Sequence, residues 1–190
     1  MGKQNIRDMD IVRNRALKQL LWVGMGSIGM FFAGLTSAYI VRKAEGNWTN
    51  FILPDWFLYS TITLIVSSFI LILATKRVKS SKAIFLPLLS VFFLGVIFTY
   101  FQLNGWQELS AQGIYLTGEG SNVAGSFLIV LTGSHLVHLV GGLIALLVTA
   151  INAKRNKYSS ENYLGLEITS IYWHFLGFLW IFLFFFLKYL

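Results

Sequence analysis

The stretch VAGSFLIVLTGSHLVHLVGGLIALLVTAIN, residues 123–152, carries no charged side chain. A helix needs about 20 apolar residues to cross the hydrocarbon core of a membrane, so this stretch is longer than one crossing requires. At its centre, His135 and His138 lie in the segment TGSHLVHLVGG, residues 132–142, among glycine and serine residues. Ionisable groups are costly inside a bilayer, so two histidines here need either a functional or a packing explanation.

Four more apolar runs are also long enough to cross a membrane. Backbone groups in lipid must be hydrogen-bonded within each segment, which predicts that all five runs are helices. We therefore predict an all-α integral membrane protein with five transmembrane helices in a single bundle. A basic cytoplasmic tail at 1–19 precedes one transmembrane domain at 20–190. The predicted helices cover about 20–41, 56–75, 83–103, 123–152 and 168–187.

Composition supports a membrane protein and excludes several other classes. The 190 residues are 56% hydrophobic and only 12% charged, whereas soluble domains carry roughly a quarter charged residues. The net charge of +7 comes from short basic clusters between apolar runs, so we expect no nucleic-acid binding. The chain has no cysteine, which excludes disulfides, thiolate metal sites and covalent haem attachment through cysteine.

The distribution of lysine and arginine predicts the orientation. Twelve lie in the N-terminal tail and in the segments after the second and fourth runs, and three lie on the other side. Because basic residues favour the cytoplasmic side, we expect a cytoplasmic N-terminus and an external C-terminus. The localisation expected is the plasma (inner) membrane of a bacterium.

The two central histidines could share a metal ion, because residues three apart lie on one face of a helix. His174 is the obvious third ligand, but depth argues against it. A rise of 1.5 Å per residue places His174 roughly 9 Å from the start of its run and His138 roughly 18 Å from the inner end of its own. The simpler interpretation is hydrogen bonding between helices, with small residues allowing close approach.

Glu167 lies two helical turns before His174, a spacing that would suit a proton relay. Its predicted place is the cytoplasmic edge of the membrane, where a carboxylate reaches water. There it also lies near the N-terminal end of a helix, whose dipole stabilises a negative charge. We therefore expect a structural role for Glu167. A proton- or solute-conducting protein that uses Glu167 and the histidines is the remote alternative.

Two other patterns predict surfaces. In the first run, small residues recur at spacings of three to five, which is typical of a close contact between helices. They are Gly24, Gly26, Gly29, Ala33, Gly34 and Ser37. The last run is rich in phenylalanine, which we interpret as a surface that faces lipid or a partner. The chain shows no nucleophile with a base, phosphate loop or carboxylate dyad, so we expect a partner subunit without catalytic residues.

Several motifs together resemble subunit III of haem–copper oxidases. Residues 132–142 are similar to that family's T-G-x-H-x-x-H-x-x-x-G stretch. Glu167 followed by Tyr172, Trp173, His174, Phe175 and Trp180 resembles its closing helix, E-x₄-Y-W-H-F-x₄-W. Residues 30–34 (MFFAG) resemble its first shared helix, and Gln102 with Trp106 resembles the end of its third.

The resemblance implies a five-helix subunit III that lacks the first two helices of the seven-helix form. Such subunits carry no haem or copper, bind beside the catalytic subunit, hold lipids between helices and sustain oxygen reduction coupled to proton pumping. We therefore expect no cofactor and no metal in this chain, with haem and copper in partner subunits. The implied partners are oxidase subunits I and II, phospholipid and a respiratory supercomplex.

Among family members, cytochrome c oxidase of the aa3 type is the favoured assignment. A quinol oxidase subunit III and an accessory subunit of nitric oxide reductase are the alternatives. Helix packing or lipid contact is the role expected for His135, His138, Glu167, Trp173 and His174. The chain departs from the family at Ile28 and Gly105, where the family often has glutamate, and at Gly177, where it often has aspartate.

Overall fold

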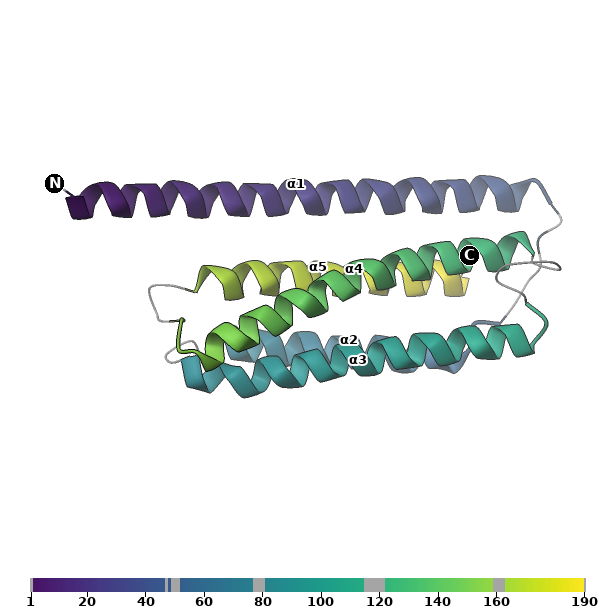
Figure 1. The fold of residues 1–190 in the computed structure, drawn as a ribbon. Helices are drawn as coiled ribbons and strands as arrows, with labels where there is room; N and C mark the ends of the chain where they lie inside the picture. The colour runs from purple at the N-terminus through teal and green to yellow at the C-terminus, as the bar shows by residue number, and fades with distance from the viewer. Residues whose placement is uncertain are drawn as a thin grey trace.

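A computed structural model describes residues 2–46, 48, 52–76, 81–114, 122–158 and 163–189, without side chains for 2–8, 10 and 81–83. Five helices make up the fold (Figure 1). They are α1 (Gly2–Ala44), α2 (Asp55–Lys76), α3 (Ser81–Ala111), α4 (Val123–Lys154) and α5 (Leu164–Tyr189). Each contains a stretch long and apolar enough to cross a membrane, which confirms the prediction of five candidate spans.

Helices α2 to α5 form a bundle, and α1 lies along one side of it. In the bundle α2 packs on α3, α3 on α4, α4 on α5 and α5 on α2, while the contacts of α1 are with α4 and α5. Figure 1 shows α1 running past the bundle at its N-terminal end. At 43 residues α1 is about 65 Å long, roughly twice the hydrocarbon thickness.

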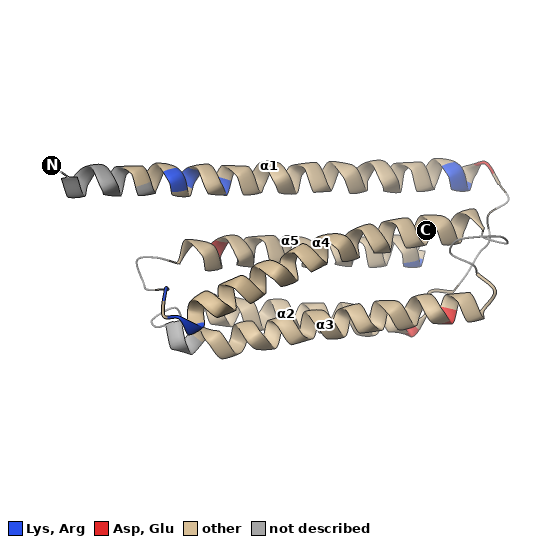
Figure 2. Ribbon diagram, in the orientation of Figure 1, with Lys and Arg blue, Asp and Glu red and all other residues tan. Residues whose placement is uncertain are grey.

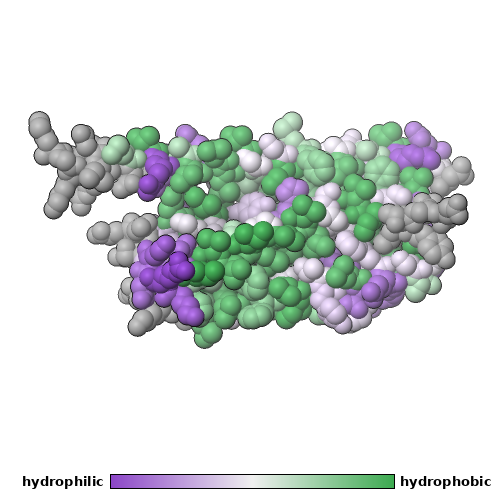
Figure 3. Space-filling model, in the orientation of Figure 1, coloured by the Kyte–Doolittle hydropathy of each residue, from purple (hydrophilic) through white to green (hydrophobic). Residues whose placement is uncertain are grey.

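The predicted tail and the first apolar run therefore share one continuous helix, of which the stretch from Ile11 to Ala44 is the candidate span. The described basic residues of the N-terminal part of α1 lie at the same end of the bundle as those at the end of α4 (Figure 2). A hydrophobic surface separates this end from the hydrophilic residues at the other (Figure 3). Which end faces the cytoplasm stays a prediction, as does the division at residue 19.

The described glycines with the least space around them lie outside α1. A Cβ atom on Gly95 would lie 2.6 Å from Leu143 Cδ2 and 2.8 Å from the indole of Trp173. A Cβ atom on Gly142 would lie 3.3 Å from the same indole. Trp173 is fully buried between α3 and α4 because both helices present glycine to it.

The prediction for the small residues of the first run is wrong within this chain. A Cβ atom placed on Gly24, Gly26, Gly29 or Gly34 would meet no other described heavy atom within 4 Å. These glycines therefore leave open space along α1, and the side of α1 that faces the bundle carries larger residues such as Phe32 and Tyr39.

The prediction for the phenylalanines of α5 is right for one side of the helix only. Phe178, Phe182 and Phe185 are exposed, but Phe184 and Phe186 are buried in the core. In the part of the chain that is described, α5 has the most buried candidate span. The reason is its central position, since α1, α2 and α4 all pack against it.

We predict that Gly95→Ala destabilises the protein and that Gly24→Ala does not. The added methyl group at Gly95 must displace Leu143 or the indole of Trp173, and overpacking of this kind costs about 1–3 kcal/mol. Both positions lie inside helices, so replacing glycine by alanine gives the same gain in helix propensity in the two variants. Thermal unfolding of the purified variants measures the difference, and equal midpoints would contradict the packing described here.

Candidate functional site

Two tryptophans of α5 donate hydrogen bonds to hydroxyl groups of α2. Trp173 Nε1 donates to Ser67 Oγ and Trp180 Nε1 donates to Thr61 Oγ1, both at 3.0 Å. All four residues are buried. The two bonds join donors seven residues apart on α5 to acceptors six residues apart on α2, so they set the register of two antiparallel helices.

A third donor reaches α2 from α3. Gln102 Nε2 donates to Ser60 Oγ at 2.7 Å, in the same turn of α2 as Thr61. The three accepting hydroxyls each donate their own hydrogen to a carbonyl of α2 three or four residues earlier, at 2.7–2.8 Å. A hydroxyl used in this way still has lone pairs for a second helix. The face formed by Ser60, Thr61 and Ser67 is therefore an acceptor surface for α3 and α5.

His135 lies in the interior beside these contacts. Its ring is fully buried, 5.9 Å from the ring of Phe98 on α3 and 5.0 Å from the ring of Trp180 on α5, between centroids. Neither ring nitrogen has a hydrogen-bond partner among the described residues. His135 of α4 thus packs against rings from α3 and α5, and none of the described residues gives it a hydrogen bond to another helix.

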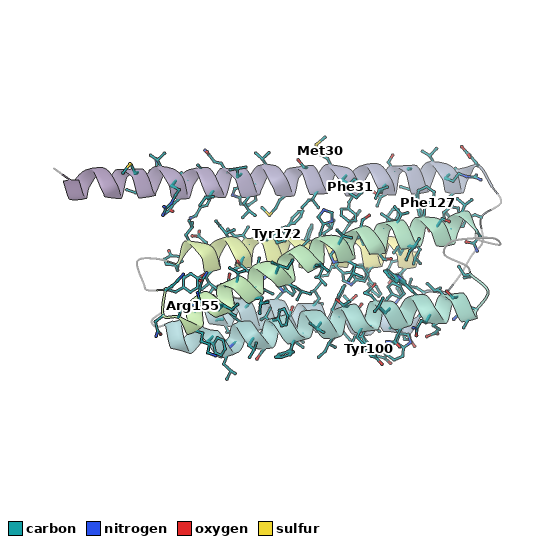
Figure 4. The ribbon with its side chains drawn as sticks, viewed as in Figure 1. Met30, Phe31, Tyr100, Phe127, Arg155 and Tyr172 are labelled. Atoms are coloured by element: carbon teal, nitrogen blue, oxygen red, sulfur yellow. The ribbon has the colours of Figure 1, made fainter. Side chains whose placement is uncertain are left out.

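His138 faces a different neighbour, although it is only three residues away. Its Nδ1 lies 2.7 Å from the Ser134 carbonyl oxygen, and its ring lies 5.8 Å from Phe32 and 6.5 Å from Phe31 of α1. In Figure 4 Phe31 lies on the bundle side of α1 and Met30 on the opposite side. Tyr172 Oη of α5 donates to the His138 carbonyl at 3.2 Å. This region of α4 therefore contacts both α1 and α5.

His174 lies in a third place, in a groove between α2 and α5 that it lines together with Ser68 and Gly177. The three histidines therefore do not converge on one point. Within the described ranges, no three histidine, aspartate or glutamate side chains lie close enough to hold one metal ion.

Glu167 pairs with a cation of α1. Lys18 Nζ lies 2.7 Å from Glu167 Oε1, and the two side chains are 39% and 33% exposed. The sequence does not by itself predict this ion pair, although Glu167 directly precedes the last apolar run and Lys18 lies two residues before the first, both at the predicted inner edge. Matching depth and opposite charge would have been the signal. Glu167 therefore joins α1 to α5, and its partner is Lys18 instead of His174.

Two apolar grooves flank α5. One, of about 320 Å³, lies against α2, and the other, of about 450 Å³, lies against α1. Phe178 lines both and is largely exposed. The groove against α1 exists partly because Gly29 and Ala33 contribute little side chain. The mostly apolar lining of both grooves suits an apolar chain better than a polar substrate.

The structure gives a packing reason for one departure from the resembled family. A Cβ atom on Gly105 would lie 2.6 Å from the ring of Phe57, which stacks on Trp180 at a centroid distance of 6.2 Å. The space beside Gly105 is thus filled by an aromatic ring from α2. At the other departures, Ile28 packs against the core and Gly177 lies beside Ser68.

Comparison with known proteins gives consistent matches. Residues 51–190 match the family described as cytochrome c oxidase subunit III. A probable cytochrome c oxidase subunit 3 of Mycobacterium tuberculosis is 31% identical over 172 residues, covering 85% of this chain and 82% of that protein. A probable quinol oxidase subunit 3 of Staphylococcus haemolyticus is 28% identical over 174 residues, covering 86% and 83%. The tick Rhipicephalus sanguineus has a cytochrome c oxidase subunit 3 that is 38% identical over 100 residues, covering 53% and 37%.

We predict that reversing either charge of the Lys18–Glu167 pair loosens α1 and that reversing both restores it. Partly exposed ion pairs contribute roughly 0.2–1 kcal/mol, so Lys18→Glu or Glu167→Lys should lower the melting temperature slightly through like-charge repulsion. The variant with both substitutions recreates an opposite pair. Thermal unfolding at low salt measures all four proteins. If the melting temperature of the double variant falls by the sum of the two single decreases, the contact contributes nothing to stability.

Proposed function

Because this chain belongs to the cytochrome c oxidase subunit III family, we propose that it is the non-catalytic subunit III of a proton-pumping respiratory terminal oxidase. In this role it stabilises the catalytic subunit and binds lipids while the complex reduces oxygen to water. We place it in the inner membrane of a bacterium, beside oxidase subunits I and II, with a respiratory supercomplex as a further assembly.

The observation that carries this proposal is that interior polar side chains are hydrogen-bonded between helices. The indoles of Trp173 and Trp180 and the amide of Gln102 hydrogen-bond to hydroxyls of α2. These groups hold helices together, and the histidines face three different surroundings. A chain built in this way suits a scaffold whose redox chemistry belongs to its partners, so we assign haem and copper to subunits I and II.

The electron donor that we favour is cytochrome c, as part of an oxidase of the aa3 type. The names of the relatives from Mycobacterium tuberculosis and Rhipicephalus sanguineus support this choice. A quinol oxidase is the second candidate, because the Staphylococcus haemolyticus relative covers the chain equally well. Subunit III in either complex would have the same fold and the same packing role.

The groove between α1 and α5 supports the lipid part of the proposal. Its lining consists of small, aliphatic and aromatic residues, with Gly29 and Ala33 on α1 and Phe178 and Phe182 on α5, and it is open along the side of the protein. An acyl chain of a phospholipid would bury apolar surface there without needing a polar partner. The groove against α2 offers a second place of the same kind.

We predict that the tagged chain co-purifies with a haem-containing complex. An affinity pull-down from membranes should give a spectrum of haem a, together with copper, and the preparation should oxidise reduced cytochrome c. Oxidation of quinol instead would select the second candidate. A tagged, unrelated membrane protein from the same cells is the control. A haem-free chain that conducts protons alone in liposomes would contradict the proposal.

We further predict that Gly29→Leu reduces the lipid retained by the complex, because the new side chain fills the groove between α1 and α5. Gly34→Leu is the matched control, since Gly34 is also a glycine of α1 with open space around it but does not line this groove. Mass spectrometry of lipid extracted from equal amounts of complex measures the effect. Equal lipid in both variants would argue against this groove as the lipid site.

A further inference from the structure

Three polar atoms in the interior of the bundle have no partner among the described residues. They are Gln102 Oε1 and both ring nitrogens of His135. The two residues are 1% and 0% exposed, so these atoms are shielded from bulk water. Buried polar groups in folded proteins are almost always hydrogen-bonded, because an unsatisfied one costs its full desolvation penalty.

These atoms belong to one layer of the bundle. Helices α3 and α4 are antiparallel, with Trp106 bonded to Thr132 and Gly95 packed against Leu143. In both contacts the two residue numbers add up to 238. In this antiparallel pair, a residue of α3 is therefore level with the residue of α4 whose number is 238 minus its own. Gln102 is therefore level with residue 136, one position from His135.

The ring contacts of His135 agree with this placement. Its ring touches Phe98, which lies one turn from Gln102 on the same helix. It also touches Trp180, whose indole bonds to Thr61, next to the Ser60 hydroxyl that Gln102 itself uses. Each of the four bundle helices thus contributes a polar residue to the layer.

The neighbouring donors in this layer are already engaged. The hydroxyls of Ser60 and Thr61 donate to the carbonyl of Phe57, and the indole of Trp180 donates to Thr61. A neutral histidine offers one N–H donor and one acceptor nitrogen, and Gln102 Oε1 needs a donor. A direct bond between the two side chains would satisfy Gln102 Oε1 and one histidine nitrogen, whereas a bridging water would satisfy the same two atoms and still have two hydrogen-bonding positions for further polar groups of the layer.

We propose that the Gln102–His135 layer is a binding site for a buried water molecule that bridges the two side chains. Water has two donors and two acceptors, so it can donate to the amide oxygen and also bond to the imidazole. Buried waters typically have two to four polar partners, and Gln102 Oε1 with one ring nitrogen of His135 supplies two. The described residues that form the layer carry no formal charge, which favours a neutral ligand over an ion.

The site goes beyond the proposed function and does not depend on it. It gives His135 a hydrogen-bonding role that contacts among the described residues do not supply. The water would link α3 to α4 at a level where Gln102 already links α3 to α2 and the rings of Trp180 and His135 link α5 to α4. One molecule would thereby complete a polar connection through the whole bundle.

A density map of the purified wild-type protein, in its native complex and at a resolution that shows ordered water, tests the site directly. We expect a peak at about 2.6–3.2 Å from both Gln102 Oε1 and a ring nitrogen of His135. A direct contact between the two side chains, or a layer without a peak between them, would overturn the proposal.

A double-mutant cycle tests the same site in solution. His135→Phe and Gln102→Leu each remove one side of the bridge, so the melting temperature of the double variant should fall by clearly less than the sum of the two single shifts. His138→Phe combined with Gln102→Leu is the matched control, and its shifts should add because His138 faces α1. Additive shifts in the His135 cycle would overturn the proposal. If one of the variants folds too poorly to be measured, the density map of the wild-type protein decides the question.

Discussion

The hydrogen bonds from indole and amide N–H groups to the hydroxyls of α2 are the interaction on which the rest of the fold depends. Between helices in lipid the hydrophobic effect gives little drive, so association rests on close packing and hydrogen bonds. Trp173 and Trp180 supply both, since each places a large ring in the core and a donor on α2. Two such bonds on one pair of helices fix their depth and rotation together, and the glycines at 95 and 142 are then needed to make room for the ring of Trp173.

The number of helices, their approximate positions and the family could be predicted from the sequence, because a membrane span depends on the summed hydropathy of about 20 residues. The neighbours of each side chain could not. Helices that are apolar all round give no periodic pattern that reveals which side is buried. For this reason the sequence does not reveal that the glycines of α1 have open space around them or that Phe184 and Phe186 are buried. This is also why His135 and His138, three residues apart, could not be assigned in advance to the interior and to α1.

The attachment of α1 differs in kind from the packing of the other four helices. It rests on aromatic contacts of Phe32 and Tyr39 and on the Lys18–Glu167 ion pair, while its glycines leave a groove beside α5. Hydrogen bonds between interior side chains thus join helices within the bundle of α2 to α5, whereas ring contacts and an ion pair join α1 to it. This division is consistent with the scaffold role that we propose.

The stability of Ser67→Ala in two backgrounds tests the central claim most directly. In the otherwise unchanged protein, this substitution leaves the indole N–H of Trp173 buried without its acceptor, and the melting temperature should fall. In a Trp173→Phe background that donor is gone and Ser67 bonds only to its own helix, so the same substitution should change the melting temperature little. An equal fall in both backgrounds would show that the bond between α5 and α2 does not hold these helices together.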